Sequence, residues 1–513
     1  MNATGASIVV TLDIGGSAAK ASAYDAARGI SLASAAVPYP AQSAAADQGQ
    51  FEPEGWWRAA LGALAELRGR TGEPAGRYLG ITVSAIRIPF VLLDGRGEVV
   101  MPGLLNGDRR AAGELGDLAA GYGADEIYRL TGHWLAPEFG LPKLLWTRKN
   151  HPAAWQATRS VLQLHDWFSY RLSGAVASEP SAAGMSQLLD VAGGGWADGL
   201  LAALGVPVSL LPELRPAGTR IGGLLPAVAA ATGFTPGTPV HLGGGDTHLS
   251  AESAGATERA VPVVVAGTTA PAQVTVAGLD FAGRAGALYP LLVSEHVTPG
   301  RHALEANAGQ TGGIVQRLDG LGGLTGEALA DELRRRGLTV RDGGPQAELT
   351  VLAGNPFFGP EGWAASPPAT VIGLSPRHSG GDVVRAGLRA TCYAIRSILG
   401  CLAGHSGISA PYIAATGGMS RNVQWAQLLA DVTGREVRVR PLDQIAGRAG
   451  AALVAGQLGP GSPAGPAADQ GPAEDVFAPR AGDAAAHAAG FALYQELYRT
   501  AQLEAHGSRM VTG

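Results

Sequence analysis

The strongest constraint on the fold is a pattern that occurs in both halves of the chain: a short β-branched apolar segment ends in a glycine-rich turn. In the first half, residues 7–13 (Ser-Ile-Val-Val-Thr-Leu-Asp) run into Ile14-Gly15-Gly16-Ser17. Two further strand-like segments follow at 18–24 and 30–37. Consecutive strands with a glycine turn in the first hairpin predict a meander.

A helix and more strands follow the predicted meander. Glu52 and Pro53 open a helical pattern that continues to Leu67, and strand patterns return at 79–83 and 90–93. Strands, a helix and more strands together predict an α/β layer architecture.

The second half repeats the sequence of events. Residues 238–242 lead into Gly243-Gly-Gly-Asp246, and residues 260–266 lead into Gly267-Thr268-Thr269 before a further strand at 272–276. The recurrence predicts two lobes, each opening with strands and a glycine turn. Two later helices are predicted to be capped by Asp382 and Asn422, with Gly434 ending the second.

Length and composition narrow the class of protein. At about 150 residues per domain, 513 residues predict roughly three units or, equally well, two large lobes. A net charge of −5 disfavours a nucleic-acid binder or a polybasic membrane anchor, and 46% hydrophobic residues exclude global disorder. Two cysteines, Cys392 and Cys401, cannot form a disulfide framework. With no basic N-terminal segment and no apolar run near about 18 residues, we expect a cytoplasmic protein without a membrane or nucleic-acid partner.

The first glycine turn offers a phosphate site. Asp13 ends a buried strand, and the backbone N–H groups of the following glycines can cradle phosphate oxygens while the carboxylate holds a hydrated Mg²⁺. The alternative is an ordinary hairpin in which Asp13 satisfies the amides of the turn.

The second turn places an acid after three glycines. Three consecutive glycines carry a large entropy cost, so Gly243–Gly245 predict unusual dihedral angles or a closely approaching ligand, with Asp246 facing an open space. The alternative is a tight turn without a ligand.

Two further glycine turns could meet a nucleotide. Gly267 and Thr268 follow a β-branched segment, and their backbone and hydroxyl groups could face a terminal phosphate. Thr416-Gly417-Gly418 leads into a helix N-terminus at Asn422, which is a ready site for polar groups of a nucleotide. Four such strand ends in one chain are much less expected by chance than one.

Other classes of enzyme can be assessed by the sequence motifs that they require. No lysine follows a glycine, so a Walker A loop is excluded, and no strand–GxGxxG–helix unit supports a dinucleotide enzyme. The chain also lacks His-Glu-x-x-His and Gly-x-Ser-x-Gly, which disfavours a zinc hydrolase and a serine hydrolase.

Along nearly its whole length the chain resembles the FGGY carbohydrate kinases, which share a superfamily with actin and heat-shock ATPases. The resembling segments follow the family's order and are Asp13 to Lys20, Glu52 to Trp57, His165 to Gly174, Gly243 to Asp246, Gly267 to Thr269, Gly373-Leu-Ser, Gly417 to Asp431 and Gly450 to Leu453. The resemblance implies a two-lobed actin-like ATPase (ribonuclease H-like) fold, an α/β fold with two similar domains and a cleft between them. It implies an N-terminal domain at 1–252, a C-terminal domain at 253–458, and a flexible connector with a C-terminal helix at 459–513.

The resemblance also implies roles for individual residues. Asp246 would be the general base, and Asp13 and Asp246 would lie beside Mg²⁺. Nucleotide-binding residues would be Gly15, Gly16, Ser17, Lys20, Gly267, Thr268, Gly312, Gln316, Gly418 and Asn422. Sugar hydroxyls would meet Arg87, Asp108, Arg110 and Asp246, since Asn106 to Arg110 is similar to the family's Asp-x-Arg motif.

Several positions depart from the family pattern. Gly16 stands where many relatives have threonine, and Ile445 where glutamate is common. Ile86 and Ile88 replace the Gln and His typical of xylulose kinases. Arg87, together with the segments 106–110 and 128–132, is more similar to the autoinducer-2 kinase branch.

The resulting hypothesis is transfer of the γ-phosphoryl group of MgATP to a hydroxyl of a small sugar, ketose or polyol, xylulose-like or autoinducer-2-like. One alternative is an inactive sugar- or nucleotide-binding regulator with the same fold, and another is a cytoskeletal filament protein. Dimers are common among relatives, so the resemblance allows a homodimer.

Overall fold

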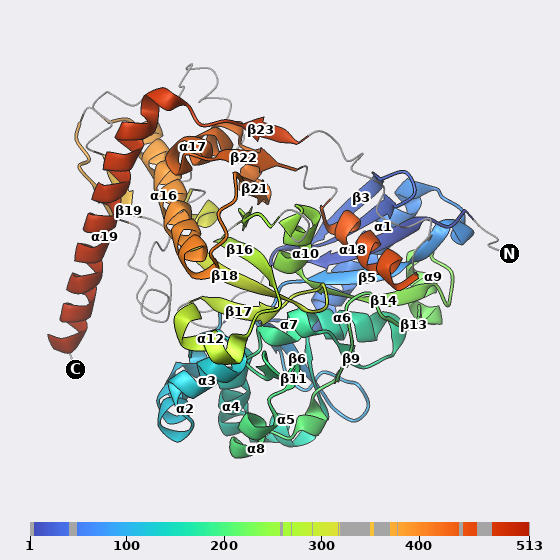
Figure 1. The fold of residues 1–513 in the computed structure, drawn as a ribbon. Coiled ribbons are helices and arrows are strands. Elements are labelled where there is room, and N and C mark those ends of the chain that lie inside the picture. Colours follow the sequence, from blue (N-terminus) through green and yellow to red (C-terminus); the bar gives the residue numbers. More distant parts are fainter. Residues whose placement is uncertain are drawn as a thin grey trace.

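The protein is described by a computed structural model, and the coloured parts of Figure 1 show its fold. The described residues are 5–40, 49–256, 260–267, 269–289, 291–315, 318, 349–352, 370–376, 378–440, 445–458 and 474–511. Two predicted nucleotide-binding residues, Thr268 and Gln316, and most of the predicted connector, 459–473, lie outside them.

The N-terminal lobe is built on a six-stranded sheet with the order β13-β14-β5-β1-β2-β3. Its strands are β1 (Ile8–Ile14), β2 (Ala18–Asp25), β3 (Ile30–Pro38), β5 (Tyr78–Ala85), β13 (Arg220–Gly223) and β14 (Pro239–Gly245). β1, β2 and β3 form the predicted antiparallel meander, whereas β5 and β14 run parallel to β1. Because parallel strands end at the same edge of a sheet, β1, β5 and β14 direct their following residues to one place.

The C-terminal lobe contains a seven-stranded sheet with the order β17-β18-β16-β15-β21-β22-β23. Its strands are β15 (Val263–Val265), β16 (Thr269–Ala277), β17 (Leu292–Glu295), β18 (Arg301–Gln310), β21 (Tyr412–Thr416), β22 (Glu436–Val439) and β23 (Asp475–Phe477). β15, β16 and β18 are antiparallel neighbours, β21 and β22 continue parallel to β15, and β23 closes the edge antiparallel. The N-terminal sheet repeats this arrangement with β1, β2, β3, β5, β14 and β13, so the prediction of two similar α/β lobes is confirmed.

Helices cover both sheets (Figure 1). The first lobe contains α1 (Pro53–Thr71), α2 (Leu115–Gly121), α3 (Ala124–Thr131), α4 (Gly140–Asn150), α5 (Pro152–Ala157), α6 (Leu164–Ser173), α7 (Pro180–Gly184), α8 (Asp198–Ala203), α9 (Pro226–Thr232) and α10 (Asp246–Ser253). The later helices are α12 (Phe281–Leu288), α16 (Gly380–Ser406), α17 (Val423–Thr433), α18 (Ile445–Leu458) and α19 (Ala484–Val511). Short strands complete the fold. A four-stranded sheet contains β4 (Gln50–Phe51), β6 (Phe90–Leu93), β7 (Gly103–Leu104) and β8 (Ser160–Gln163). Three two-stranded ladders pair β9 (Ala177–Ser178) with β12 (Glu213–Leu214), β10 (Leu189–Asp190) with β11 (Gly195–Trp196), and β19 (Thr350–Leu352) with β20 (Thr370–Ile372).

The predicted helix at 52–67 is α1, which packs on β2 and β3. Pro53 occupies its first turn, where a missing N–H is tolerated, and Gly72 ends it in the left-handed conformation at φ +60°. Trp56, Leu64 and Leu67 bury the apolar face of the helix in the N-terminal core.

The later helix caps were partly predicted. Asn422 caps α17 by accepting hydrogen bonds from the N–H groups of Gln424 and Trp425, and Gly434 ends that helix. The prediction of Asp382 as a cap is wrong, because Ser379 is the N-cap of α16. Asp382 is the third residue of α16, and its carboxylate accepts a hydrogen bond from the Ser379 N–H, so the two residues form a capping box.

One helix late in the sequence lies on the first sheet. α18 packs against β1, β2 and α10, and a Cβ on Gly450 would lie 2.2 Å from Thr11 Oγ1. The glycine therefore permits α18 to approach β1 closely. No helix among the described segments is long and apolar enough to cross a membrane.

Candidate active site

Asp13 and Asp246 lie at neighbouring strand ends of the N-terminal sheet. Asp13 is the penultimate residue of β1, and Asp246 follows β14 as the first residue of α10. Ser84 of β5 lies between the two strands and donates a hydrogen bond of 2.9 Å to Asp13 Oδ1. The fold therefore brings together two carboxylates that the sequence separates widely.

The pKa values of both carboxyl groups are raised above that of an ordinary aspartate. Burial raises the pKa of Asp246 to about 6; the Arg87 guanidinium acts to lower it and the Asp13 carboxylate to raise it further. Burial also raises the pKa of Asp13, against the opposing effects of Lys20 and of the Ser84 hydrogen bond. Asp246 still exposes 33% of its side chain, so a small molecule can reach it. A carboxyl group that is reachable and has a pKa near neutrality is suited to accept a proton.

The three glycines before Asp246 serve protein packing. The sequence predicted unusual dihedral angles or a closely approaching ligand here; none of Gly243–Gly245 has a positive φ, and the approach of a ligand stays a prediction. A Cβ on Gly243 would lie 1.8 Å from the Val83 carbonyl oxygen, and one on Gly245 would lie 2.6 Å from Arg87 Cδ. The glycines let β14 lie close to β5 and let the Arg87 side chain cross the strand end.

Arg87 lies beside Asp246 and is almost fully buried. Its Nε is 4.0 Å from Asp246 Oδ1, and its Nη2 donates a hydrogen bond of 3.1 Å to Thr247 Oγ1. Thr247 in turn donates from its N–H (2.7 Å) and from its hydroxyl (3.2 Å) to Asp246 Oδ1. The next residue in this segment, Ile88, has φ +88°, which is rare for a β-branched residue and marks backbone strain beside Arg87.

The first glycine turn is an open hairpin. Gly16, Ser17 and Lys20 are exposed, and a Cβ on Gly16 would meet nothing within 4 Å. Lys20 pairs with Asp13 across the ladder between β1 and β2. The turn therefore presents its backbone next to the Asp13 carboxylate.

Three glycines of the C-terminal lobe gather around one point. A Cβ on Gly312 would lie 2.3 Å from the Gly267 carbonyl oxygen and 3.2 Å from Met419 Sδ, directly after Gly418. The Met419 N–H donates to the Ala266 carbonyl group, which joins the turn before α17 to the turn after β15. Gly267, Gly312 and Gly418 are thus brought together, and Asn422 begins α17 nearby. The Asn422 side-chain oxygen is already used as a cap.

Asp108 and Arg110 are bonded to each other. Arg110 Nε lies 3.1 and 3.0 Å from the two carboxylate oxygens of Asp108, and its guanidinium lies over the Trp146 ring, 4.6 Å from the centroid. Asp108 is 1% exposed. In the described contacts no hydrogen bond or ion pair links this pair directly to Asp246 or Arg87.

Three residues of the aspartate site were not singled out from the sequence. Ser84 and Thr247 carry no motif signal, although Thr247 follows Asp246 directly. Glu305 lies in the middle of β18 and reaches Arg87 with distances of 3.0 and 2.9 Å from Arg87 Nη2 to its two oxygens. Only a charged residue inside an apolar strand pattern could have indicated Glu305.

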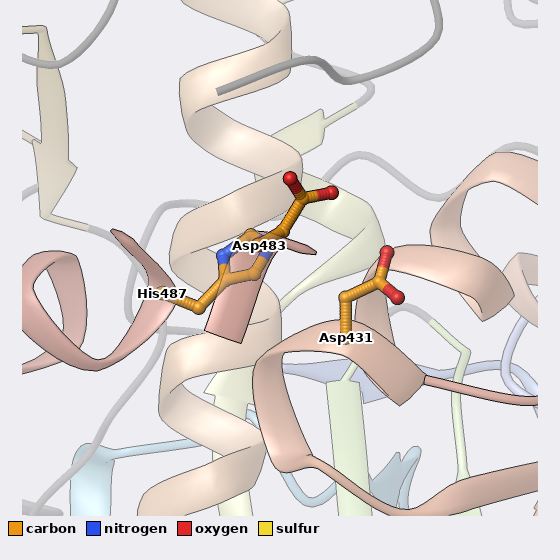
Figure 2. A group of neighbouring side chains, drawn as sticks. All are labelled: Asp431, Asp483 and His487. Carbon is orange, nitrogen blue, oxygen red and sulfur yellow. The ribbon is translucent and has the colours of Figure 1, made fainter. Parts of the chain in front are cut away.

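A separate group of acidic and histidine side chains lies at the start of the C-terminal helix (Figure 2). Donor atoms of Asp431, Asp483 and His487 all lie within 4.8 Å of one another. The Asp431 carboxylate accepts hydrogen bonds from Arg480 at its backbone N (2.8 Å) and at Nε (3.0 Å). Because an arginine already neutralises Asp431, we read this group as an ion-pair link between α17 and the C-terminal segment.

Comparison with known proteins finds two consecutive domains of one family over most of the chain. The N-terminal domain of the FGGY family of carbohydrate kinases matches residues 8–252, and the C-terminal domain of that family matches residues 301–457. An autoinducer-2 kinase from Salmonella typhimurium is 26% identical over 426 residues, which cover 78% of this chain and 76% of the relative.

Solved structures agree in fold. A xylulose kinase from Rhodospirillum rubrum superposes with a TM-score of 0.81 at 25% identity, over 97% of this chain and 100% of the relative. A ligand-bound xylulose kinase from Lactobacillus acidophilus reaches a TM-score of 0.83 at 20% identity, over 96% and 98% of the two chains, and supports the fold alone. The fold is therefore that of the two-lobed, actin-like sugar kinases, as the motifs predicted. With both family domains matched in order, the chain belongs to the FGGY family of carbohydrate kinases, phosphotransferases that use an alcohol group as acceptor.

Proposed function

We propose that the protein transfers the γ-phosphoryl group of ATP to a hydroxyl of a small sugar, ketose or polyol, of a xylulose-like or autoinducer-2-like kind. The observation that carries this proposal is the Asp246 carboxyl group, reachable from solvent, with a pKa raised to about 6 and next to a second strand-end carboxylate, Asp13. The names of the relatives, an autoinducer-2 kinase and a xylulose kinase, supply the substrate class.

In this proposal Asp246 is the general base. The acceptor oxygen attacks the γ-phosphorus as the bond to the ADP oxygen breaks, and Asp246 takes the proton that the hydroxyl loses. Phosphoryl transfer has a loose transition state, so positioning and charge neutralisation supply most of the catalysis. The hydrogen bonds from Thr247 to Asp246 Oδ1 fix the carboxylate and leave its other oxygen for the acceptor.

Asp13 and Asp246 are the residues that we propose beside Mg²⁺. Carboxylate oxygens are the donors that this ion prefers, and the Asp13 carboxylate acts to raise the pKa of Asp246, an interaction between two acids that suits a divalent cation. When bound, Mg²⁺ would neutralise the charge on the phosphates. The chain's own residues hold the carboxylates in place through the Ser84 and Thr247 hydrogen bonds.

The two lobes would share the remaining contacts. The nucleotide would lie against Gly15, Gly16, Ser17 and Lys20 on one side and against Gly267, Thr268, Gly312, Gln316, Gly418 and Asn422 on the other. The gathering of Gly267, Gly312 and Gly418, where a Cβ on Gly312 would lie 2.3 Å from the Gly267 carbonyl oxygen, supports the second set. Sugar hydroxyls would meet Arg87, Asp108 and Arg110. We further propose that the enzyme works in the cytoplasm, with a homodimer as the first oligomeric state to test.

A coupled ADP-release screen tests the proposal. Wild-type protein with MgATP is offered ketopentoses, polyols and the linear autoinducer-2 precursor, with EDTA-treated samples as the matched control. We expect ADP release above the no-acceptor rate with at least one acceptor, and its loss with EDTA. A melting shift with a sugar but no ADP from any acceptor would contradict the proposal and favour a binding regulator.

A further inference from the structure

An ion pair joins the two lobes at the candidate base. Arg87 follows β5 of the first sheet, and Glu305 lies in β18 of the second, where it pairs in register with Gln273 of β16 and Leu292 of β17. Arg87 Nη2 lies 3.0 Å from Glu305 Oε1 and 2.9 Å from Oε2. The two side chains are 7% and 3% exposed. Among the described residues, Arg87 is the cation within ion-pair distance of Glu305.

The pair is part of a chain of contacts that ends at Asp246. The same Arg87 Nη2 donates to Thr247 Oγ1, and Thr247 donates to Asp246 Oδ1. The guanidinium is too far from the aspartate for a hydrogen bond, since its Nε lies 4.0 Å from Asp246 Oδ1. The Arg87 side chain passes close to Gly245. A Cβ at Gly245 would lie 2.6 Å from Arg87 Cδ, so the glycine leaves the room that the arginine occupies.

Glu305 and Asp246 therefore compete for one guanidinium. A buried arginine that loses its carboxylate partner moves toward the nearest remaining one, because an unpaired buried charge is strongly unfavourable. Among the described residues, Asp246 is the other carboxylate within ion-pair distance of Arg87. A full Arg87–Asp246 ion pair would occupy the carboxylate oxygens that the acceptor hydroxyl needs.

We propose that Glu305 is a positioning residue: its carboxylate, supplied by the C-terminal lobe, holds Arg87 away from Asp246 and keeps the base free when the two lobes are packed together. This inference rests on the proposed function of Asp246. Glu305 acts through Arg87 and makes no contact with the reacting atoms. Because the Arg87–Glu305 pair spans the two lobes, the packing of the lobes determines whether Asp246 is free to accept a proton.

Steady-state kinetics of four proteins test this role, using the best acceptor for wild type: wild type, Glu305→Gln, Arg87→Met and the double variant. We expect Glu305→Gln to lower kcat on the order of 10²-fold with little change in KM for ATP, as for a misplaced catalytic group. In the Arg87→Met background, Glu305→Gln should have little further effect on kcat, since no guanidinium remains to be misplaced. A merely structural role would give additive losses in the two backgrounds.

Two more variants keep the test decisive. Glu295→Gln removes the carboxylate of an ion pair with His302 (3.6 Å) in the same sheet, and it should leave kcat unchanged. Should Glu305→Gln not fold, Glu305→Asp keeps the charge one methylene shorter, and we expect reduced kcat at wild-type KM for ATP. Normal kcat in Glu305→Gln or Glu305→Asp, with wild type active, overturns this inference alone. Wild type without turnover on any acceptor overturns the proposed function and this inference with it.

Discussion

Asp13 lies in β1 and Asp246 directly follows β14, and a single strand, β5, separates these two parallel strands in the sheet. Ser84 of β5 pairs in register with Asp13 on one side and with Gly244 on the other. Two carboxylates held this close disfavour each other's ionised form, and Asp13 accordingly acts to raise the pKa of Asp246. The chemistry that we propose depends on this proximity.

Replacing Asp246 with asparagine should lower kcat by roughly 10²–10⁴-fold, the range for a positioned general base. The amide keeps the shape of the side chain and cannot take the proton of the acceptor. Coupled ADP release at saturating sugar and MgATP measures the effect. The matched control is Asp198→Asn, an exposed aspartate of α8, which should retain wild-type kcat. Near-normal turnover of Asp246→Asn would show that another group is the base.

The pH dependence of kcat/KM should show an acidic limb centred near pH 6, where Asp246 titrates. Below it, the rate should fall about tenfold per pH unit because the protonated carboxyl group cannot accept a proton. The charged groups that face Asp246 are Asp13 from β1 and Arg87 after β5. Burial lowers the pKa of His133 to about 4 and that of His248 well below its usual value, so neither becomes charged in this range.

The Arg87→Met variant provides a second test of the acidic limb in the pH dependence of kcat/KM. Arg87 acts to lower the pKa of Asp246, so its removal should move the limb to higher pH. Initial rates between pH 5 and pH 8 measure both proteins. A flat profile for wild type across that range would rule out Asp246 as the titrating base.

Gly16→Thr should fold normally and lower KM for ATP by about 2- to 10-fold, the effect of one added hydrogen bond to a phosphate. A Cβ at this position meets nothing within 4 Å, and Gly16 does not have a positive φ, so a side chain is tolerated. Gly16→Val has the same shape without the hydroxyl and should keep the wild-type KM. Equal KM values for the threonine and valine variants would mean that the turn does not contact the phosphates.

Gly243→Ala should destabilise the protein by about 3 kcal/mol or more, since an added methyl in a packed site forces the backbone to move. Its Cβ would lie 1.8 Å from the Val83 carbonyl oxygen, so β14 and β5 must separate. The same substitution at Gly69 in α1, where nothing lies within 4 Å, should be neutral or stabilise by up to about 1 kcal/mol. Thermal unfolding midpoints compare the two, and similar midpoints would contradict the packing role.

Arg110→Met should cost about 3–5 kcal/mol of stability in the absence of substrate, because it removes the guanidinium that pairs with the buried Asp108 carboxylate. Arg215→Met removes a surface partner of Glu213 and should cost about 0–1 kcal/mol. Urea unfolding distinguishes the two. If Arg110→Met is as stable as Arg215→Met, the Asp108–Arg110 pair does not support the fold, and its predicted contact with sugar becomes the main reason for its presence.

Local chemistry in the sequence determined much of the fold. The β-branched segments became β1, β5 and β15, and the glycine turn after Asp13 became the first hairpin. Asn422 and Gly434 end α17 as predicted, because a cap depends on residues within one turn of helix. The recurrence of strands and glycine turns indicated two similar lobes, and the motif order indicated the family.

Only the tertiary structure decided which of these elements meet. Gly243 and Gly245 make room for the carbonyl group of Val83 in β5 and for the Arg87 side chain just after β5, both far away in the sequence. The cap of α16 is an exception that remains local: Ser379-x-x-Asp382 is a capping box, a pattern in which the serine is the N-cap and the acidic residue lies at the third helical position. The contact between Arg87 and Glu305 depends on how two separate sheets pack, and no sequence spacing encodes that distance. Strand and cap propensities act over a few residues, whereas the site is made of strand ends that the whole fold must first bring together.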